Sequence, residues 1–124
     1  MQSRFLLLDT VIFIILIYIN LISAYGQAEQ PSIHIIQGSS SPSNFGFYSQ
    51  PFIEVGRGTK ISWINDDSVD HTVTFVDTTN TEKINQVDDI VKPSHSITYQ
   101  FNVPGVYDYY CKIYPFMTGR VSVK

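Results

Sequence analysis

The stretch that decides the fold runs from Val106 to Met117 and reads Val-Tyr-Asp-Tyr-Tyr-Cys-Lys-Ile-Tyr-Pro-Phe-Met. If its first half is a strand, Tyr107, Tyr109 and Cys111 share one face, because successive side chains of a strand point to opposite faces. The second half puts the single cysteine of the chain six residues before a methionine, with a proline between them. This pattern predicts a buried strand that ends in a short loop, which the proline stiffens by fixing φ.

The surrounding segment 27–124 predicts an all-β fold. Its short alternating runs are separated by turn residues, as in a sandwich or barrel of about seven to eight strands. The stretch Ile84–Ile90 reads either as a short strand or as a helical turn. The predicted strands are Ser32–Gln37, Phe52–Val55, Lys60–Asn65, Thr72–Val76, Ser96–Phe101, Val106–Cys111 and Gly119–Lys124. The predicted core is Ile61, Trp63, Val73, Phe75, Tyr107, Tyr109, Val121 and Val123.

The N-terminal segment 1–26 is of a different kind. Arg4 precedes an almost wholly apolar run, Val11–Leu21, and small residues follow it. This pattern indicates a secretory signal peptide. The alternative is a retained membrane anchor, since residues 5–22 are about long enough to span a bilayer, although Asp9 would be costly there. In both cases the domain 27–124 lies outside the cytoplasm, in a periplasm, secreted, or on the outer face of the membrane.

An extracytoplasmic location makes the single cysteine informative. Exported domains normally pair their cysteines, and Cys111 has no partner in this chain. It is therefore free, intermolecular or a metal ligand, or it is a small buried core residue. Cysteine and methionine together with His71, which follows a predicted strand, are the soft ligands from which electron-transfer copper sites are built. The net charge of −3 gives no indication of nucleic-acid binding.

These motifs resemble the cupredoxins, or blue copper proteins, and are most similar to amicyanin and plastocyanin. The resemblance covers residues from about 50 to 124 and rests on Ile61–Asp67 leading to His71–Val73, on Phe101–Cys111, on Pro115–Met117 and on Gly119–Val121. It implies a Greek-key β-sandwich or barrel over residues 27–124. It also implies an exported single-domain protein that binds one copper ion, as Cu(I) or Cu(II), and serves in electron transfer or copper handling. The expected partner is a redox protein or a copper donor or acceptor.

The resemblance also assigns the site residues. His71 would supply the imidazole at the strand end, Cys111 the thiolate and Met117 the axial sulfur. Asn65 resembles the family residue that braces the cysteine loop by hydrogen bonds. Tyr114 stands where the family has its second histidine.

Three alternatives follow for Tyr114. It could bind Cu(II) as a phenolate, since the charge of the metal ion favours loss of the phenol proton. It could leave a three-coordinate site of His71, Cys111 and Met117, which suits Cu(I) and a copper carrier. Finally, the domain could bind no metal and act as a cupredoxin-like binding or structural module at the cell surface.

Other polar residues carry less weight. We expect His34 and His95 to be exposed and away from the ligand loop. Asp66, Asp67 and Asp70 read as turn residues, with an acidic rim that steers a basic partner as the alternative. Neither a Ser-His-Asp pattern nor a pair of carboxylates suggests catalysis, so we expect the protein not to be an enzyme.

Overall fold

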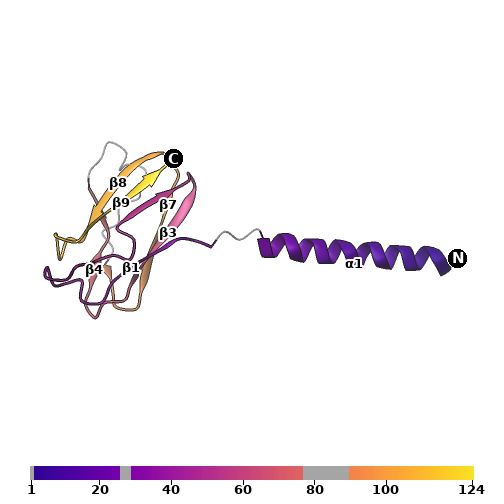
Figure 1. Ribbon diagram of the computed structural model, residues 1–124, viewed down its shortest axis with the longest axis horizontal. Coiled ribbons are helices and arrows are strands. Elements are labelled where there is room, and N and C mark those ends of the chain that lie inside the picture. The colour runs from indigo at the N-terminus through magenta and orange to yellow at the C-terminus, as the bar shows by residue number, and fades with distance from the viewer. Residues whose placement is uncertain (1, 26–28, 77–89) are drawn as a thin grey trace.

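The described part of the chain consists of one helix and nine strands (Figure 1). The computed structural model describes residues 2–25, 29–76 and 90–124. The helix is α1 (Gln2–Tyr25). The strands are β1 (Ser32–Ile35), β2 (Phe52–Val55), β3 (Thr59–Asn65), β4 (His71–Thr72), β5 (Thr74–Phe75), β6 (Ile90–Val91), β7 (Ser96–Phe101), β8 (Gly105–Tyr110) and β9 (Thr118–Val123).

Two main sheets enclose the core. One has the order β1-β3-β7 and the other β2-β9-β8-β5, while β4 and β6 form a separate pair. The pairs β1 with β3 and β2 with β9 are parallel, and the other pairs are antiparallel. Aromatic rings fill the space between the sheets: Trp63 lies 5.3 Å from Tyr109 and 6.1 Å from Phe75, centroid to centroid. Edge-to-face pairs at these distances add to the stabilisation from apolar burial.

The predicted core is confirmed, because all eight of its members are buried. The β-sandwich class is likewise confirmed. The predicted strand Thr72–Val76 was wrong in one respect: the chain breaks at Val73 into β4, which pairs with β6, and β5, which pairs with β8. Thr72 and Thr74 are buried along with His71, so this segment is covered on both faces and simple alternation does not describe it. The ambiguous stretch 84–90 lies outside the described residues except for Ile90, which begins β6.

Helix α1 stands apart from the sandwich (Figure 1). Its segment Arg4–Ala24 has a mean hydropathy of 2.6 and none of it is buried against the domain. Length and composition therefore suit a membrane span, and a signal sequence near an N-terminus has the same character.

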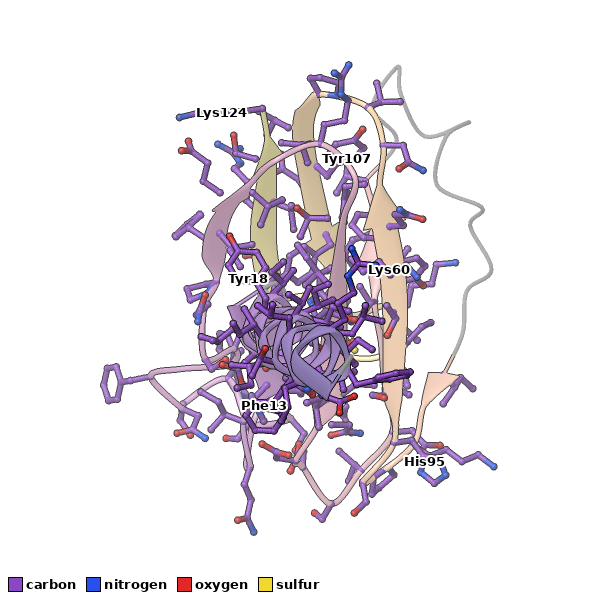
Figure 2. All side chains as sticks on the ribbon, turned by 90° about the vertical axis from the view of Figure 1, so that its right-hand side faces the viewer. Phe13, Tyr18, Lys60, His95, Tyr107 and Lys124 are labelled. Carbon is purple, nitrogen blue, oxygen red and sulfur yellow. The ribbon has the colours of Figure 1, made fainter. Side chains whose placement is uncertain are left out.

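The segments that carry the predicted ligands meet at one end of the sandwich. Figure 2 looks along α1 and shows Tyr107 and Lys124 toward one end, with His95 at the other. Strand β3 ends at the His95 end, because the backbone N–H of Asn65 donates to the His95 carbonyl at 2.9 Å. Strand β8 reaches the same region, since Tyr110 pairs with Thr74 just after the His71 segment.

Candidate metal centre

His71 is held in place by a buried carboxylate. Its Nε2 lies 2.8 Å from Oδ2 of Asp67, and the two side chains are 0% and 3% exposed. The other oxygen of Asp67 accepts hydrogen bonds from the backbone N–H groups of Gly38 and Ser68, both at 2.9 Å. Gly38 has a φ of +85°, a conformation that glycine adopts readily. Asp67 therefore fixes the orientation of the imidazole and leaves Nδ1 facing away from the carboxylate.

The imidazole Nδ1 faces the cysteine sulfur. Nδ1 of His71 lies 3.6 Å from Sγ of Cys111, and the backbone N–H of Thr72 donates to the same sulfur at 3.4 Å. Burial alone would raise the pKa of the thiol. Hydrogen bonds from His71 and from the backbone N–H groups of Thr72, Tyr114 and Ile113 outweigh this effect and lower the pKa from 9.0 to about 7. The surroundings of Cys111 therefore stabilise a thiolate, the form of cysteine that binds metals.

The pKa values of His71 and Asp67 also differ from their ordinary values. Burial lowers the pKa of His71, but hydrogen bonds with Cys111 and Asp67 outweigh it, so that the pKa lies above its ordinary value. For Asp67, burial raises the pKa, but hydrogen bonds from Gly38, His71 and Ser68 hold it below its usual range. Negative charge on both sides of the ring, from Asp67 and from the Cys111 thiolate, thus favours the protonated imidazole.

The loop after Cys111 is closed by backbone hydrogen bonds. The N–H of Cys111 donates to the carbonyl of Met117 at 3.1 Å, and the N–H of Met117 donates to the carbonyl of Tyr114 at 2.9 Å. Met117 is fully buried and belongs to the same core cluster as Cys111. The structure therefore brings His71 and Cys111 into contact, and it places Met117 inside the loop that begins at Cys111.

Tyr114 covers this region from the outside. It is partly buried, and its ring lies 5.3 Å from the ring of His71 at an angle of 52°. On its other side the ring lies 6.2 Å from that of Phe116, which in turn lies 5.2 Å from Phe47. The three aromatic rings and the imidazole thus form a continuous row over the ligand loop.

The bracing role expected of Asn65 is performed differently. Asn65 is buried, and its amide donates to the carbonyls of Val69 and Val91, both at 2.8 Å, while its Oδ1 accepts from the N–H of Asp67. Within the part of the chain that the structure describes, these bonds join Asn65 to the segment before His71 and to β6.

Thr72 makes the connection to the cysteine loop instead. Its Oγ1 accepts from the N–H of Lys112 at 2.8 Å and lies 3.1 Å from Oγ1 of Thr74. Sequence reasoning missed this residue, although a hydroxyl directly after the predicted histidine ligand is a signal that could have pointed to it.

The remaining histidines lie elsewhere, as expected. His34 is partly buried, with 42% of its side chain exposed, and pairs with Asp66, Nδ1 to Oδ2, at 2.6 Å. His95 is exposed, and its Nδ1 donates to the carbonyl of Pro93 at 2.9 Å. Among the described residues, no three side chains of the His, Cys, Asp and Glu types lie close enough to hold a metal ion. A metal at this site would depend on the sulfur of Met117 in addition to His71 and Cys111.

The geometry of the two contacting donors fits a soft metal ion. Nitrogen and sulfur atoms bound to one ion at about 2.0–2.3 Å are separated by roughly 3.5 Å when the angle between the bonds is near 110°. The distance of 3.6 Å between Nδ1 of His71 and Sγ of Cys111 matches that separation. A carboxylate on the far nitrogen of a ligating histidine is also the usual arrangement in metal sites.

Comparison with known proteins places the chain in a family. The model of the copper binding proteins of the plastocyanin/azurin family matches residues 38–124. The chain belongs to this family. Its members are cupredoxins, which bind a single copper ion, and the copper ligands predicted from the sequence stand at the end of the sandwich described above.

The sequence is also similar to those of individual cupredoxins. Amicyanin-alpha of Methylorubrum extorquens is 30% identical over 77 residues, which make up 62% of this chain and 64% of the relative. Amicyanin of Paracoccus denitrificans is 32% identical over 77 residues, or 58% of its length. The chain thus aligns with less than two thirds of each of these two relatives.

Solved structures confirm the cupredoxin fold over a larger part of the chain. A purple cupredoxin from Nitrosopumilus maritimus superposes with a TM-score of 0.67 at 33% identity, covering 76% of this chain and 99% of that protein. A reduced Cu(I) form of an amicyanin mutant superposes with a TM-score of 0.63 at 26% identity, covering 79% of this chain and 85% of the amicyanin.

Proposed function

We propose that this chain binds one copper ion through His71, Cys111 and Met117 and serves as a single-electron carrier. The observation that carries the proposal is the 3.6 Å contact between Nδ1 of His71 and Sγ of Cys111, with Asp67 on the opposite nitrogen. Copper, when bound, supplies a one-electron couple, and soft sulfur donors with an imidazole suit both of its valences. The alternative use of the same site is copper handling, with a copper donor or acceptor as partner. The titration below tests the copper binding that both uses require.

The protein's own contribution is to hold the donors still. Asp67 keeps His71 in one orientation, and backbone N–H groups around Cys111 stabilise the thiolate. Thr72 ties the cysteine loop to the histidine strand through Lys112. A site that is fixed in this way needs little rearrangement when an electron arrives or leaves, which favours electron transfer.

We further propose that the domain works outside the cytoplasm. The support is α1, whose apolar segment Arg4–Ala24 suits either a signal peptide or a membrane anchor through residues 5–22. A retained helix would tether the carrier to the outer face of the membrane, near membrane-bound redox partners. Comparing the mass of the mature protein with that of the full sequence would distinguish cleavage after about residue 26 from retention.

A copper titration of the full chain in detergent tests the site. We expect one equivalent of copper to bind, either as Cu(II) with a thiolate-to-copper visible band or as Cu(I) in competition with a chromophoric chelator. Binding should be lost in Cys111→Ser and in His71→Ala. It should persist in His34→Ala, which removes a histidine that pairs with Asp66 and not with the predicted ligands. Failure of the reduced protein to bind either valence would reject the copper site and leave a metal-free module.

A further inference from the structure

We infer that Tyr114 covers the copper site without coordinating copper, so that the site offers three donors and prefers Cu(I). The inference rests on the proposed function. It concerns the position at which the resemblance to cupredoxins predicts a second histidine. It also chooses among the three roles that the sequence leaves open for Tyr114.

The first argument is the reach of the side chain. The backbone at Tyr114 lies close to the cysteine sulfur, because its N–H forms a hydrogen bond with Cys111 and its carbonyl accepts from the N–H of Met117 at 2.9 Å. In a histidine at this position, Nδ1 would be bonded to Cγ, the ring carbon attached to Cβ, and would therefore lie close to the backbone. A phenol carries its oxygen on the far side of the six-membered ring. On the same backbone, the phenol oxygen of a tyrosine therefore ends at a different point from Nδ1 of a histidine.

The second argument is where the ring lies. Its contacts are aromatic on both sides, with His71 at 5.3 Å and Phe116 at 6.2 Å. Both distances fall within the range of roughly 4.5–7 Å in which tilted aromatic pairs attract each other. The ring of Tyr114 therefore packs over the imidazole as part of the aromatic row and keeps water away from the donors beneath it.

The third argument is the chemistry of the donors that remain. His71 contributes one nitrogen, and Cys111 and Met117 contribute two sulfurs. Thiolate and thioether ligands select Cu(I), whereas additional imidazoles suit Cu(II). Compared with a site that has a second histidine at position 114, this site has one imidazole fewer and an aromatic cover in its place. It should therefore bind Cu(I) more tightly than Cu(II).

The test compares the full chain with Tyr114→Phe and Tyr114→His, each in detergent. Affinities for Cu(I) are measured anaerobically by competition with a chromophoric chelator, and affinities for Cu(II) by visible titration. Tyr114→Phe keeps the ring and removes only the hydroxyl. We expect its Cu(I) affinity to stay within threefold of wild type and its Cu(II) spectrum to be unchanged. Tyr114→His should bind Cu(II) at least tenfold more tightly and develop an intense thiolate-to-copper band.

Three results would overturn the inference. A tenfold loss of affinity in Tyr114→Phe would make the phenol a ligand, as would a phenolate vibration in the resonance Raman spectrum of the wild type. No gain of Cu(II) affinity in Tyr114→His would show that the missing imidazole does not set the preference. In these cases the proposed function stands as long as copper binds. If none of the three proteins binds either valence, the inference and the proposed function are both rejected.

Discussion

Replacing Asp67 by asparagine should reverse the polarity of its hydrogen bond with His71, the proposed histidine ligand. Oδ1 of Asp67 accepts from two backbone N–H groups, and an asparagine keeps its carbonyl oxygen there. Its amide NH2 then replaces Oδ2 opposite Nε2 of His71. An NH2 group can only donate, so Nε2 must become the acceptor and the proton of the neutral ring moves to Nδ1. That proton lies on the nitrogen that faces Cys111, where a metal ion would have to displace it.

The structure sets the size of the effect. The bond between Asp67 and His71 is 2.8 Å long and joins side chains that are 3% and 0% exposed, so water does not weaken it. Hydrogen bonds to charged groups contribute about 1.5–3 kcal/mol, and 1.4 kcal/mol corresponds to a factor of ten in a binding constant. We therefore expect Asp67→Asn to bind copper about 10- to 100-fold more weakly, the range usual for partners of ligating histidines.

The neighbouring residue offers a matched control. Asp66 also contacts a histidine, but His34 and Asp66 are 42% and 50% exposed. Exposed ion pairs contribute roughly 0–1 kcal/mol. Asp66→Asn should therefore leave copper affinity within about threefold of wild type. Competition titration with a chromophoric chelator measures both variants, and circular dichroism verifies that each is folded.

Nitrogen-15 NMR of the metal-free protein examines the cause directly. At a pH above the raised pKa of His71, the proton should reside on Nε2 in wild type and on Nδ1 in Asp67→Asn. Equal copper affinities for the two asparagine variants would refute the reasoning. An unchanged tautomer together with weaker binding would refute the proposed cause and leave Asp67 as a merely structural residue.

Two substitutions test the packing of the scaffold, and a pH titration tests the ionisation of Cys111. Gly119→Ala would bring a methyl group closer to the Tyr109 ring than van der Waals contact allows, and it should lower the unfolding free energy by about 1–3 kcal/mol, measured by thermal unfolding. The control is Gly56→Ala, where the methyl group meets nothing within 4 Å and the loss should be less than about 0.5 kcal/mol. Tyr48→Phe removes a buried hydroxyl that has no hydrogen-bond partner among the described residues, and it should raise the unfolding free energy by up to about 1 kcal/mol. A lower unfolding free energy in this variant would contradict the prediction and show that the hydroxyl makes a stabilising hydrogen bond. In the metal-free protein the ultraviolet absorbance of the Cys111 thiolate should titrate near pH 7 when folded and near 9 when unfolded. Because the folded pKa is the lower one, this group adds roughly 2–3 kcal/mol of stability above pH 9, and that contribution disappears as pH falls through 7; a folded midpoint near 9 would contradict it.

The parts of the site that sequence predicts are those fixed by strand register. Trp63, Tyr107 and Tyr109 are buried because alternation within β3 and β8 puts them on the inner face. Cys111 directly follows β8 on the same face, so its burial follows from the same rule. The contact between Cys111 and His71 was implied by the resemblance to cupredoxins, since no local pattern specifies a pairing across forty positions.

The parts that sequence does not predict depend on turn geometry. Asp67 reads as a turn residue beside Asp66 and Asp70, and composition cannot say which of the three carboxylates points inward. The structure selects Asp67 because the N–H of Gly38, on a distant loop, is available to it. The break of the predicted strand at Val73 has a similar origin, since β4 and β5 pair with different partners.

The arrangement of the donors bears on how the site would work. Nδ1 of His71 and Sγ of Cys111 lie 3.6 Å apart, the imidazole held by Asp67 and the sulfur by the N–H of Thr72. The energy that keeps a thiolate and an oriented imidazole side by side is therefore supplied by folding, through Asp67 and the N–H of Thr72. Such a scaffold imposes nearly the same donor positions on either valence of copper, so the valence that it prefers depends on the number and softness of its donors. Tyr114, the aromatic cover in our inference, is therefore the residue whose replacement should shift the balance between Cu(I) and Cu(II) while the fold remains intact.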